Sequence, residues 1–148
     1  MMNLPLVLRG SARPFVLIGG GRVAARKLLT LLKAGAQVQL IAPELHADIA
    51  ACAGNPLLSI EQRPASLTET FDSGSLVVLA TDNHALNKQL TINARKAGCL
   101  VCRCDETENN DFIFPAVIDR SPLLVSISTS GASPALTRYV RQRLEAFL

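Results

Sequence analysis

The feature that most constrains this chain is a run of three glycines between an apolar segment and a helical pattern. Residues 15–18 read Phe-Val-Leu-Ile, and Gly19-Gly-Gly-Arg-Val-Ala24 follows at once. Read as G-x-G-x-x-A, the pattern predicts a tight turn at Gly19, close approach of a pyrophosphate at Gly21, and tight packing of the helix through Ala24. The N–H groups of the helix beginning at Arg22 would then face the phosphates. We expect a dinucleotide site here, and the alternative is a purely structural glycine turn.

Strand-like and helix-like segments alternate through most of the chain. Apolar runs typical of strands lie at residues 15–18, 37–42, 58–61, 76–80 and 100–104. Helical patterns separate them, and are expected from Arg22 to Gly35, around Ile49 and Ala50, after Ser66-Leu-Thr-Glu69 with its capping-box spacing, and from Asp82 or Asn83 to Gly98. This alternation predicts an α/β fold, a Rossmann-like doubly wound parallel sheet, with an NAD-binding Rossmann domain over residues 1–111.

The two ends of the chain have other patterns. Residues 4–8 are expected to form a short edge segment, because Pro5 cannot donate to a strand ladder. After residue 111, apolar runs at 112–118 and 123–128 flank a turn, and Ser133-Pro134 is typical of the start of a helix. A two-stranded hairpin is marginal alone. We therefore expect residues 112–148 to be a hairpin-plus-helix dimerisation appendage that is buried against a second copy of the chain.

Composition excludes several classes of partner. The net charge is +3 and aromatic residues make up only 4%, which argues against nucleic acid and suits a small polyanionic ligand. No apolar run reaches membrane-spanning length, and the N-terminal residues lack a signal-peptide pattern, so we expect no membrane association and a cytoplasmic protein.

The cysteines and histidines give weaker signals. Cys99, Cys102 and Cys104 lie on one expected strand, so their thiols should point to alternating faces, and no histidine is near them in the sequence. We expect small buried hydrophobes rather than metal ligands, and no metal site. His46 and His84 are interpreted as isolated residues on helix surfaces.

Ligands of an open parallel sheet bind beyond the carboxyl ends of its strands. The candidates at these ends are Gly19, Gly21, Arg22, Val23, Pro43, Glu44, Thr81, Asp82 and Asp105. Glu44 lies where an acid commonly holds the adenosine ribose, or else starts the next helix. No arginine cluster accompanies it, which favours NAD over NADP, although Arg22 could meet a phosphate. Asp82 is a ligand candidate or a helix cap.

Asp105 is the catalytic candidate. It ends the fifth expected strand, just before a polar loop. A carboxylate at this place can accept a proton while a hydride leaves for nicotinamide. The alternative is an aspartate that only forms the turn.

Several segments together resemble a known family. They are Gly19-Gly-Gly-Arg-Val-Ala24 with Arg26-Lys27, Ala80-Thr-Asp82 followed by Asn87, Asp105 seven residues before Phe112, Pro115-Ala-Val-Ile-Asp-Arg-Ser-Pro122, and Ser128-Thr-Ser-Gly-Ala-Ser-Pro134. Over essentially its whole length the chain resembles the precorrin-2 dehydrogenase/sirohydrochlorin ferrochelatase family, the N-terminal part of siroheme synthase. The last two segments are far more specific than the glycine turn.

The resemblance implies NAD-dependent oxidation of precorrin-2 to sirohydrochlorin, and in bifunctional members insertion of ferrous iron to give siroheme. It also implies a homodimer interlocked through the region after the sheet. Arg22-Val23 and Pro43-Glu44 fall where the family binds NAD, and Asp105 falls at its catalytic aspartate. Thr129 falls where some members carry a phosphorylatable serine. Members usually continue beyond the position of Leu148, so iron insertion and any continuation of the chain past Leu148 are left open.

Substrate-binding candidates lie in the C-terminal region. The hydroxyls of Ser128, Thr129 and Ser130 precede a helix N-terminus, and Arg120 and Arg138 can pair with substrate carboxylates. The alternatives are an ordinary turn and a solvated helix face. The rival function is a non-enzymatic Rossmann module that senses a nucleotide and regulates a partner.

Overall fold

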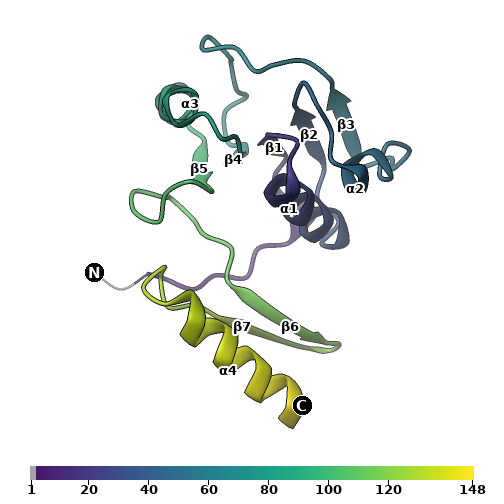
Figure 1. Cartoon of the computed structure of the whole chain (residues 1–148), viewed down its shortest axis with the longest axis vertical. Coiled ribbons are helices and arrows are strands. Elements are labelled where there is room, and N and C mark those ends of the chain that lie inside the picture. Colours follow the sequence, from purple (N-terminus) through teal and green to yellow (C-terminus); the bar gives the residue numbers. More distant parts are fainter. Residues whose placement is uncertain (1–2) are drawn as a thin grey trace.

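The computed structural model describes residues 3–148, and its centre is one parallel five-stranded sheet. The strand order is β3-β2-β1-β4-β5, with β1 (Phe15–Ile18), β2 (Val38–Ile41), β3 (Leu58–Glu61), β4 (Leu76–Leu79) and β5 (Leu100–Arg103). Helices α1 (Arg22–Lys33) and α2 (Ala47–Ala50) cover one face, and α3 (His84–Lys96) covers the other (Figure 1). The predicted doubly wound Rossmann-like sheet is confirmed.

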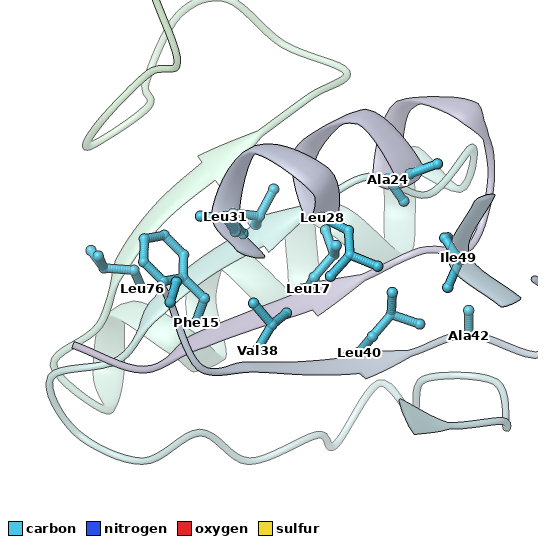
Figure 2. Close-up of a cluster of buried hydrophobic side chains, with 13 residues drawn as sticks. Phe15, Leu17, Ala24, Leu28, Leu31, Val38, Leu40, Ala42, Ile49 and Leu76 are labelled. Carbon is cyan, nitrogen blue, oxygen red and sulfur yellow. The ribbon is translucent and has the colours of Figure 1, made fainter. Parts of the chain in front are cut away.

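The core follows from the alternation of side chains along the central strand. Leu17 faces α1 and α2, whereas Val16 and Ile18 face α3. Leu28 and Leu31 of α1 lie directly over β1 and β2 (Figure 2). Burying one such side chain stabilises the fold by about 1.5–3 kcal/mol, so both faces of the sheet are held by apolar contact. The glycine turn therefore leaves from a rigid strand at the middle of the sheet.

Two local predictions are wrong. Residues 66–69 form a turn, not a helix, although Ser66 N–H does donate to Glu69 Oε2 at 3.0 Å. The Glu69 carboxylate is also drawn to Arg63, whose Nη2 lies 2.7 Å from Oε1, so the capping contacts close a turn. Residues 4–8 form no strand and are exposed. They lead through the short helix η1 (Gly10–Ala12) into β1, which already has a neighbour on each side.

The C-terminal region forms the predicted hairpin and helix. Strands β6 (Ala116–Arg120) and β7 (Leu123–Ile127) pair antiparallel, and α4 (Pro134–Phe147) packs on them, apart from the parallel sheet (Figure 1). Ser133 caps α4 as expected, because its Oγ accepts a hydrogen bond from Leu136 N–H at 3.2 Å. Within residues 3–148, no helix combines the length and apolar character needed to cross a membrane.

The hairpin begins later than predicted. Phe112 and Phe114 are not part of β6, because their rings pack against the core beneath α1. The rings contact each other with centroids 5.8 Å apart, and Lys27 Nζ of α1 lies 4.2 Å from the centre of the Phe114 ring. The segment that leads into the hairpin is thus anchored on α1.

Candidate functional site

The three glycines of the turn have three different reasons to be glycine. Gly19 has φ +133°, and a Cβ there would lie 2.4 Å from the carbonyl oxygen of Ala80. A Cβ on Gly20 would lie 1.9 Å from the carbonyl oxygen of Glu44. A Cβ on Gly21 would meet no atom of the described residues within 4 Å. The fold itself therefore leaves open space at Gly21, which fits a ligand approaching the backbone there.

Helix α1 begins directly after this open position. Its first turn contains no acidic residue, and Arg22 and Val23 are exposed. The unpaired N–H groups of a first helical turn, together with the positive end of the helix dipole, favour an anion. Ala24 is completely buried, so the helix packs as tightly as the sequence pattern requires. The residues present fit the pyrophosphate of a dinucleotide.

The loop after β2 lies against the glycine turn. His46 N–H donates to the carbonyl oxygen of Gly20 at 2.7 Å, and both Pro43 and Glu44 are exposed. Helix α2 begins at Ala47, so the alternative that Glu44 starts this helix is wrong. Glu44 remains beside the turn, where its predicted ribose contact is possible. The sequence analysis gave no role to Gly20, whose only signal was that the middle position of G-x-G is itself a glycine.

The loop after β4 is held by a buried amide. Asn87 is fully buried, accepts a 2.6 Å hydrogen bond from Thr81 Oγ1 and donates to the Thr81 carbonyl oxygen at 3.0 Å. Asn83 caps α3, because its Oδ1 accepts from Leu86 N–H at 3.0 Å. The interpretation of Asp82 as the cap is therefore wrong, and Asp82 is exposed one residue earlier. Thr81 positions the loop beside Gly19.

Asp105 follows β5 at the same edge and is the centre of a charged cluster. Its side chain is only 8% exposed. Oδ1 accepts from Arg103 Nε at 3.1 Å, Oδ2 accepts from Arg103 Nη2 at 2.9 Å, and His84 Nδ1 lies 2.6 Å from Oδ2. Arg103 also pairs with Glu106, with Nη1 2.6 Å from Oε2. The carboxylate is thus enclosed by donors.

The electrostatics of Asp105 follow from this enclosure. Burial by itself raises the pKa of Asp105, but hydrogen bonds from Arg103, His84 and Asn87 outweigh burial and hold the pKa well below its usual range. Asp105 is therefore ionised at every physiological pH. Such a stabilised carboxylate is also a weaker proton acceptor than a free one.

His84 is a site residue that the sequence interpretation missed. It is exposed as expected, but it is not isolated, because its ring contacts Asp105. The two residues are far apart in the sequence and meet because β4 and β5 are neighbouring parallel strands. Both residues follow the carboxyl ends of their strands, but no local pattern in the sequence joins them.

The cysteines around β5 are buried or half-buried, as predicted, and their thiols lie on both faces of the sheet. Cys99 packs on the α3 side, whereas Cys102 and Cys104 are two residues apart, lie on the same face and meet. A hydrogen bond from Cys102 lowers the pKa of Cys104 to about 7, against the effect of burial and aided by Lys27. The same contact, together with burial, raises the pKa of Cys102. Among residues 3–148, no three His, Cys, Asp or Glu side chains are grouped to hold a metal ion.

The hydroxyl-rich loop lies against the Asp105 loop. A Cβ on Gly131 would lie 3.3 Å from Cβ of Thr107, two residues after Asp105. Thr129 Oγ1 donates to the Ser133 carbonyl oxygen and accepts from Ser133 N–H, while Ser128 Oγ accepts from Ser130 N–H. These bonds fix the loop beside the site. Arg120 and Arg138, on β6 and α4, are exposed.

A cavity of about 550 Å³ lies elsewhere on the sheet. It is lined mainly by residues at the amino ends of the strands, among them Phe15, Val38 and Leu58. None of the predicted site residues lines it. Because ligands of parallel sheets bind at the carboxyl ends, the candidate site is defined by the glycine turn and the Asp105 cluster.

Comparison with known families identifies both parts of the chain. A family model described as "Putative NAD(P)-binding" matches residues 6–116. A second model, described as "Sirohaem biosynthesis protein central", matches residues 120–146. The first match covers the glycine turn, the Thr81 loop and Asp105, and the second covers most of the hairpin and α4.

Individual proteins agree with these families. The chain is 42% identical to "Siroheme synthase 2" of Aeromonas salmonicida, covering 100% of this chain and 30% of that protein. It is 40% identical to "Siroheme synthase" of Nitrosococcus oceani, covering 100% and 31%. The chain thus spans about a third of the length of these curated relatives.

A solved structure has the same fold as this chain. The protein named "SirC, precorrin-2 dehydrogenase" superposes with a TM-score of 0.81 at 27% identity, covering 99% of this chain and 71% of that one. The resemblance deduced from the sequence motifs is confirmed. Residues 120–146 match the central segment of sirohaem biosynthesis proteins. The chain belongs to the putative NAD(P)-binding family, whose model matches residues 6–116.

Proposed function

We propose that this chain oxidises precorrin-2 to sirohydrochlorin with NAD as the hydride acceptor. One observation carries the proposal: the ionised Asp105 cluster lies on the same sheet edge as the glycine turn of an NAD(P)-binding family. The name of SirC, precorrin-2 dehydrogenase, supplies the substrate class.

The turn and the neighbouring loop provide the cofactor site. Gly19, Gly21 and the first turn of α1 would hold the pyrophosphate, with the exposed Arg22 and Val23 beside it. Glu44, after Pro43, accepts hydrogen bonds from the adenosine ribose, which selects NAD over NADP. Thr81 and Asp82 border the nicotinamide end, since their loop runs between Gly19 and the Asp105 cluster.

The chain's own residues then serve the oxidation. When bound, NAD⁺ supplies the oxidised nicotinamide ring that accepts a hydride. Removal of the substrate's second hydrogen as a proton requires an acceptor nearby, and Asp105 supplies the permanent negative charge that favours proton removal. Ser128, Thr129 and Ser130 line the adjoining loop, and Arg120 and Arg138 pair with the carboxylates of the tetrapyrrole.

The active form in this proposal is a homodimer. Within Pro134–Phe147 no residue of α4 is buried, and large apolar side chains of the hairpin and helix are exposed, among them Leu123, Leu124, Leu136, Tyr139 and Phe147. Apolar surface of this kind is typical of an interface, and a two-stranded hairpin is only marginally stable by itself. A second copy of the chain covers this surface.

Oxidation is the activity that the site supports, and ferrous iron as a second substrate is a separate question. The rival is a module that binds the nucleotide only to regulate a partner.

The test is to mix the full chain with precorrin-2 and NAD and to record absorption spectra. We expect NADH to accumulate in equal amount with sirohydrochlorin. Asp105→Ala is the control, and it should bind NAD but turn over slowly. NAD binding by wild type without any conversion of precorrin-2 would exclude the dehydrogenase and favour the sensing module.

A further inference from the structure

We propose that His84 is the residue that takes the proton during this oxidation, and that Asp105 acts through His84 as a positioning residue. The inference rests on the proposed function and names a further catalytic group of the same site. It is carried by the contact between the two side chains, by their unequal exposure and by the other bonds of Asp105.

The accessible member of the pair is the imidazole. The His84 side chain is 76% exposed, whereas that of Asp105 is 8% exposed. Both oxygens of Asp105 already accept hydrogen bonds, Oδ1 from Arg103 and Oδ2 from Arg103 and His84. A large tetrapyrrole that settles on this edge of the sheet therefore meets the ring of His84 before it can meet the carboxylate.

The contact also determines which nitrogen is available. An ionised carboxylate can only accept hydrogen bonds, so the 2.6 Å contact requires the proton on His84 Nδ1. The lone pair of the neutral ring is then on Nε2, on the side away from Asp105. This is the arrangement by which a buried aspartate orients a histidine and stabilises the imidazolium that forms.

Arg103 makes the carboxylate a fixed partner rather than a free one. Its guanidinium donates two hydrogen bonds to Asp105, and its third contact is to Glu106. Asp105 is in direct contact with His84, and Arg103 and Glu106 lie behind Asp105. The carboxylate is held in one orientation, so the imidazole it bonds is held as well.

The oxidation removes two hydrogens from the substrate, one as hydride and one as a proton. A C–H bond of the substrate breaks and its hydrogen leaves with both electrons, as hydride, to the nicotinamide of NAD⁺. A second hydrogen leaves the substrate as a proton, and its bonding pair becomes part of the new double bond of the macrocycle. That proton forms a bond to Nε2 of His84, and the imidazolium later releases it to water.

The experiment compares His84→Gln, His84→Ala and the control Lys96→Ala, at the exposed far end of α3, in the full chain. Glutamine can still donate to Asp105 but cannot take a proton, and His84 is exposed enough for the fold to tolerate the change. We expect the His84 variants to lose about 10²- to 10⁴-fold in kcat with NAD affinity unchanged by calorimetry. Free imidazole should restore part of the rate of His84→Ala, and Lys96→Ala should match wild type.

A second readout does not depend on turnover. The chain has two histidines, so ¹⁵N NMR of the imidazole nitrogens resolves each ring. We expect the Nδ1–H tautomer for His84 in wild type and a mixture of tautomers in Asp105→Ala, with His46 unchanged.

The outcomes separate the two proposals. Failure of wild type to oxidise precorrin-2 would remove the proposed function and this role with it. Active wild type with His84→Gln at the same rate, or His84→Ala without rescue by imidazole, would overturn the role of His84 alone.

Discussion

Gly20 and Glu44 are in such close backbone contact that a Cβ on residue 20 would lie 1.9 Å from the Glu44 carbonyl oxygen. The neighbouring bond from His46 N–H to the Gly20 carbonyl oxygen fixes the same two loops together. The loop expected to hold the ribose is therefore positioned by the glycine turn that is expected to hold the pyrophosphate.

Gly20→Ala should lower the stability of the fold, whereas Gly21→Asp should remove NAD binding. Gly20→Ala forces the β2–α2 loop away and should lower the free energy of unfolding by about 1–3 kcal/mol. Gly21→Asp meets open space, so the fold should keep its stability, but the added carboxylate should abolish NAD binding. Urea denaturation and calorimetry check the two effects. A stable Gly20→Ala protein, or Gly21→Asp with wild-type NAD affinity, would contradict the assignment of these glycines.

Asn83→Ala should destabilise α3 and Asp82→Ala should not. The Asn83 side chain caps the first turn, and loss of such a cap costs about 1 kcal/mol. Asp82 is exposed and is the matched control one residue away. Thermal unfolding of both variants checks the prediction, and an equal loss in the two would show that Asp82 shares the capping role.

Asp105 should make the chain sensitive to acid. The folded-state pKa of Asp105 lies below the unfolded value of about 3.9, so its stabilisation is fully present above that value and is lost as the pH falls through the lower folded value. We expect the free energy of unfolding to fall less between about pH 5 and pH 2 in Asp105→Asn than in wild type. Denaturation at a series of pH values measures this. Parallel curves for the two proteins would argue against the stabilised carboxylate.

Cys104, just after β5, should be more reactive than the other thiols near this strand. Its pKa of about 7 leaves roughly half of it as thiolate at neutral pH, whereas burial raises the pKa of Cys99. We expect iodoacetamide to label Cys104 well before Cys99, and labelling to slow in Cys102→Ala because the supporting hydrogen bond is gone. Peptide mass spectrometry follows each site. Equal labelling of Cys104 and Cys99 would refute the contact between the Cys102 and Cys104 thiols.

The hairpin and α4 should hold two copies together. Leu124 on β7 is 54% exposed, and Leu67 in the 66–69 turn is 59% exposed, so a change at Leu67 is a control of similar exposure. Sedimentation at micromolar concentration should give a dimer for wild type and Leu67→Asp, and a monomer for Leu124→Asp. A folded wild-type monomer would remove the homodimer from the proposal.

Periodicity predicted the sheet well because each strand is a short apolar run between a helix and a turn. The five parallel strands and the cap at Ser133 needed only local information, whereas the cap of α3 was placed one residue early, at Asp82 instead of Asn83. Residues 66–69 show the limit of local signals, since the capping contacts are present but Arg63 draws Glu69 into a turn. No local pattern reports such a competition.

Spacing names candidate site residues one at a time, whereas contacts between two segments leave no trace in the local pattern. Gly19, Gly21 and Asp105 stand at strand ends and could be named from spacing alone. The partners of Asp105 could not, because Arg103 alternates with apolar residues and His84 lies 21 positions away. Only the neighbouring placement of β4 and β5 joins them. For the same reason the contact of Gly131 with Thr107 had no sequence signal.

The aromatic pair Phe112 and Phe114 has a geometric consequence for the proposed dimer. These rings attach the lead into the hairpin to the flank of α1, and Lys27 closes over Phe114. The first turn of the same helix borders the glycine turn. In a dimer built on the hairpins, these rings therefore help to set the spacing and tilt between the two cofactor sites, together with the ion pair between Lys33 of α1 and Asp119 of β6. A smaller side chain at position 112 or 114 would change the angle between the subunits.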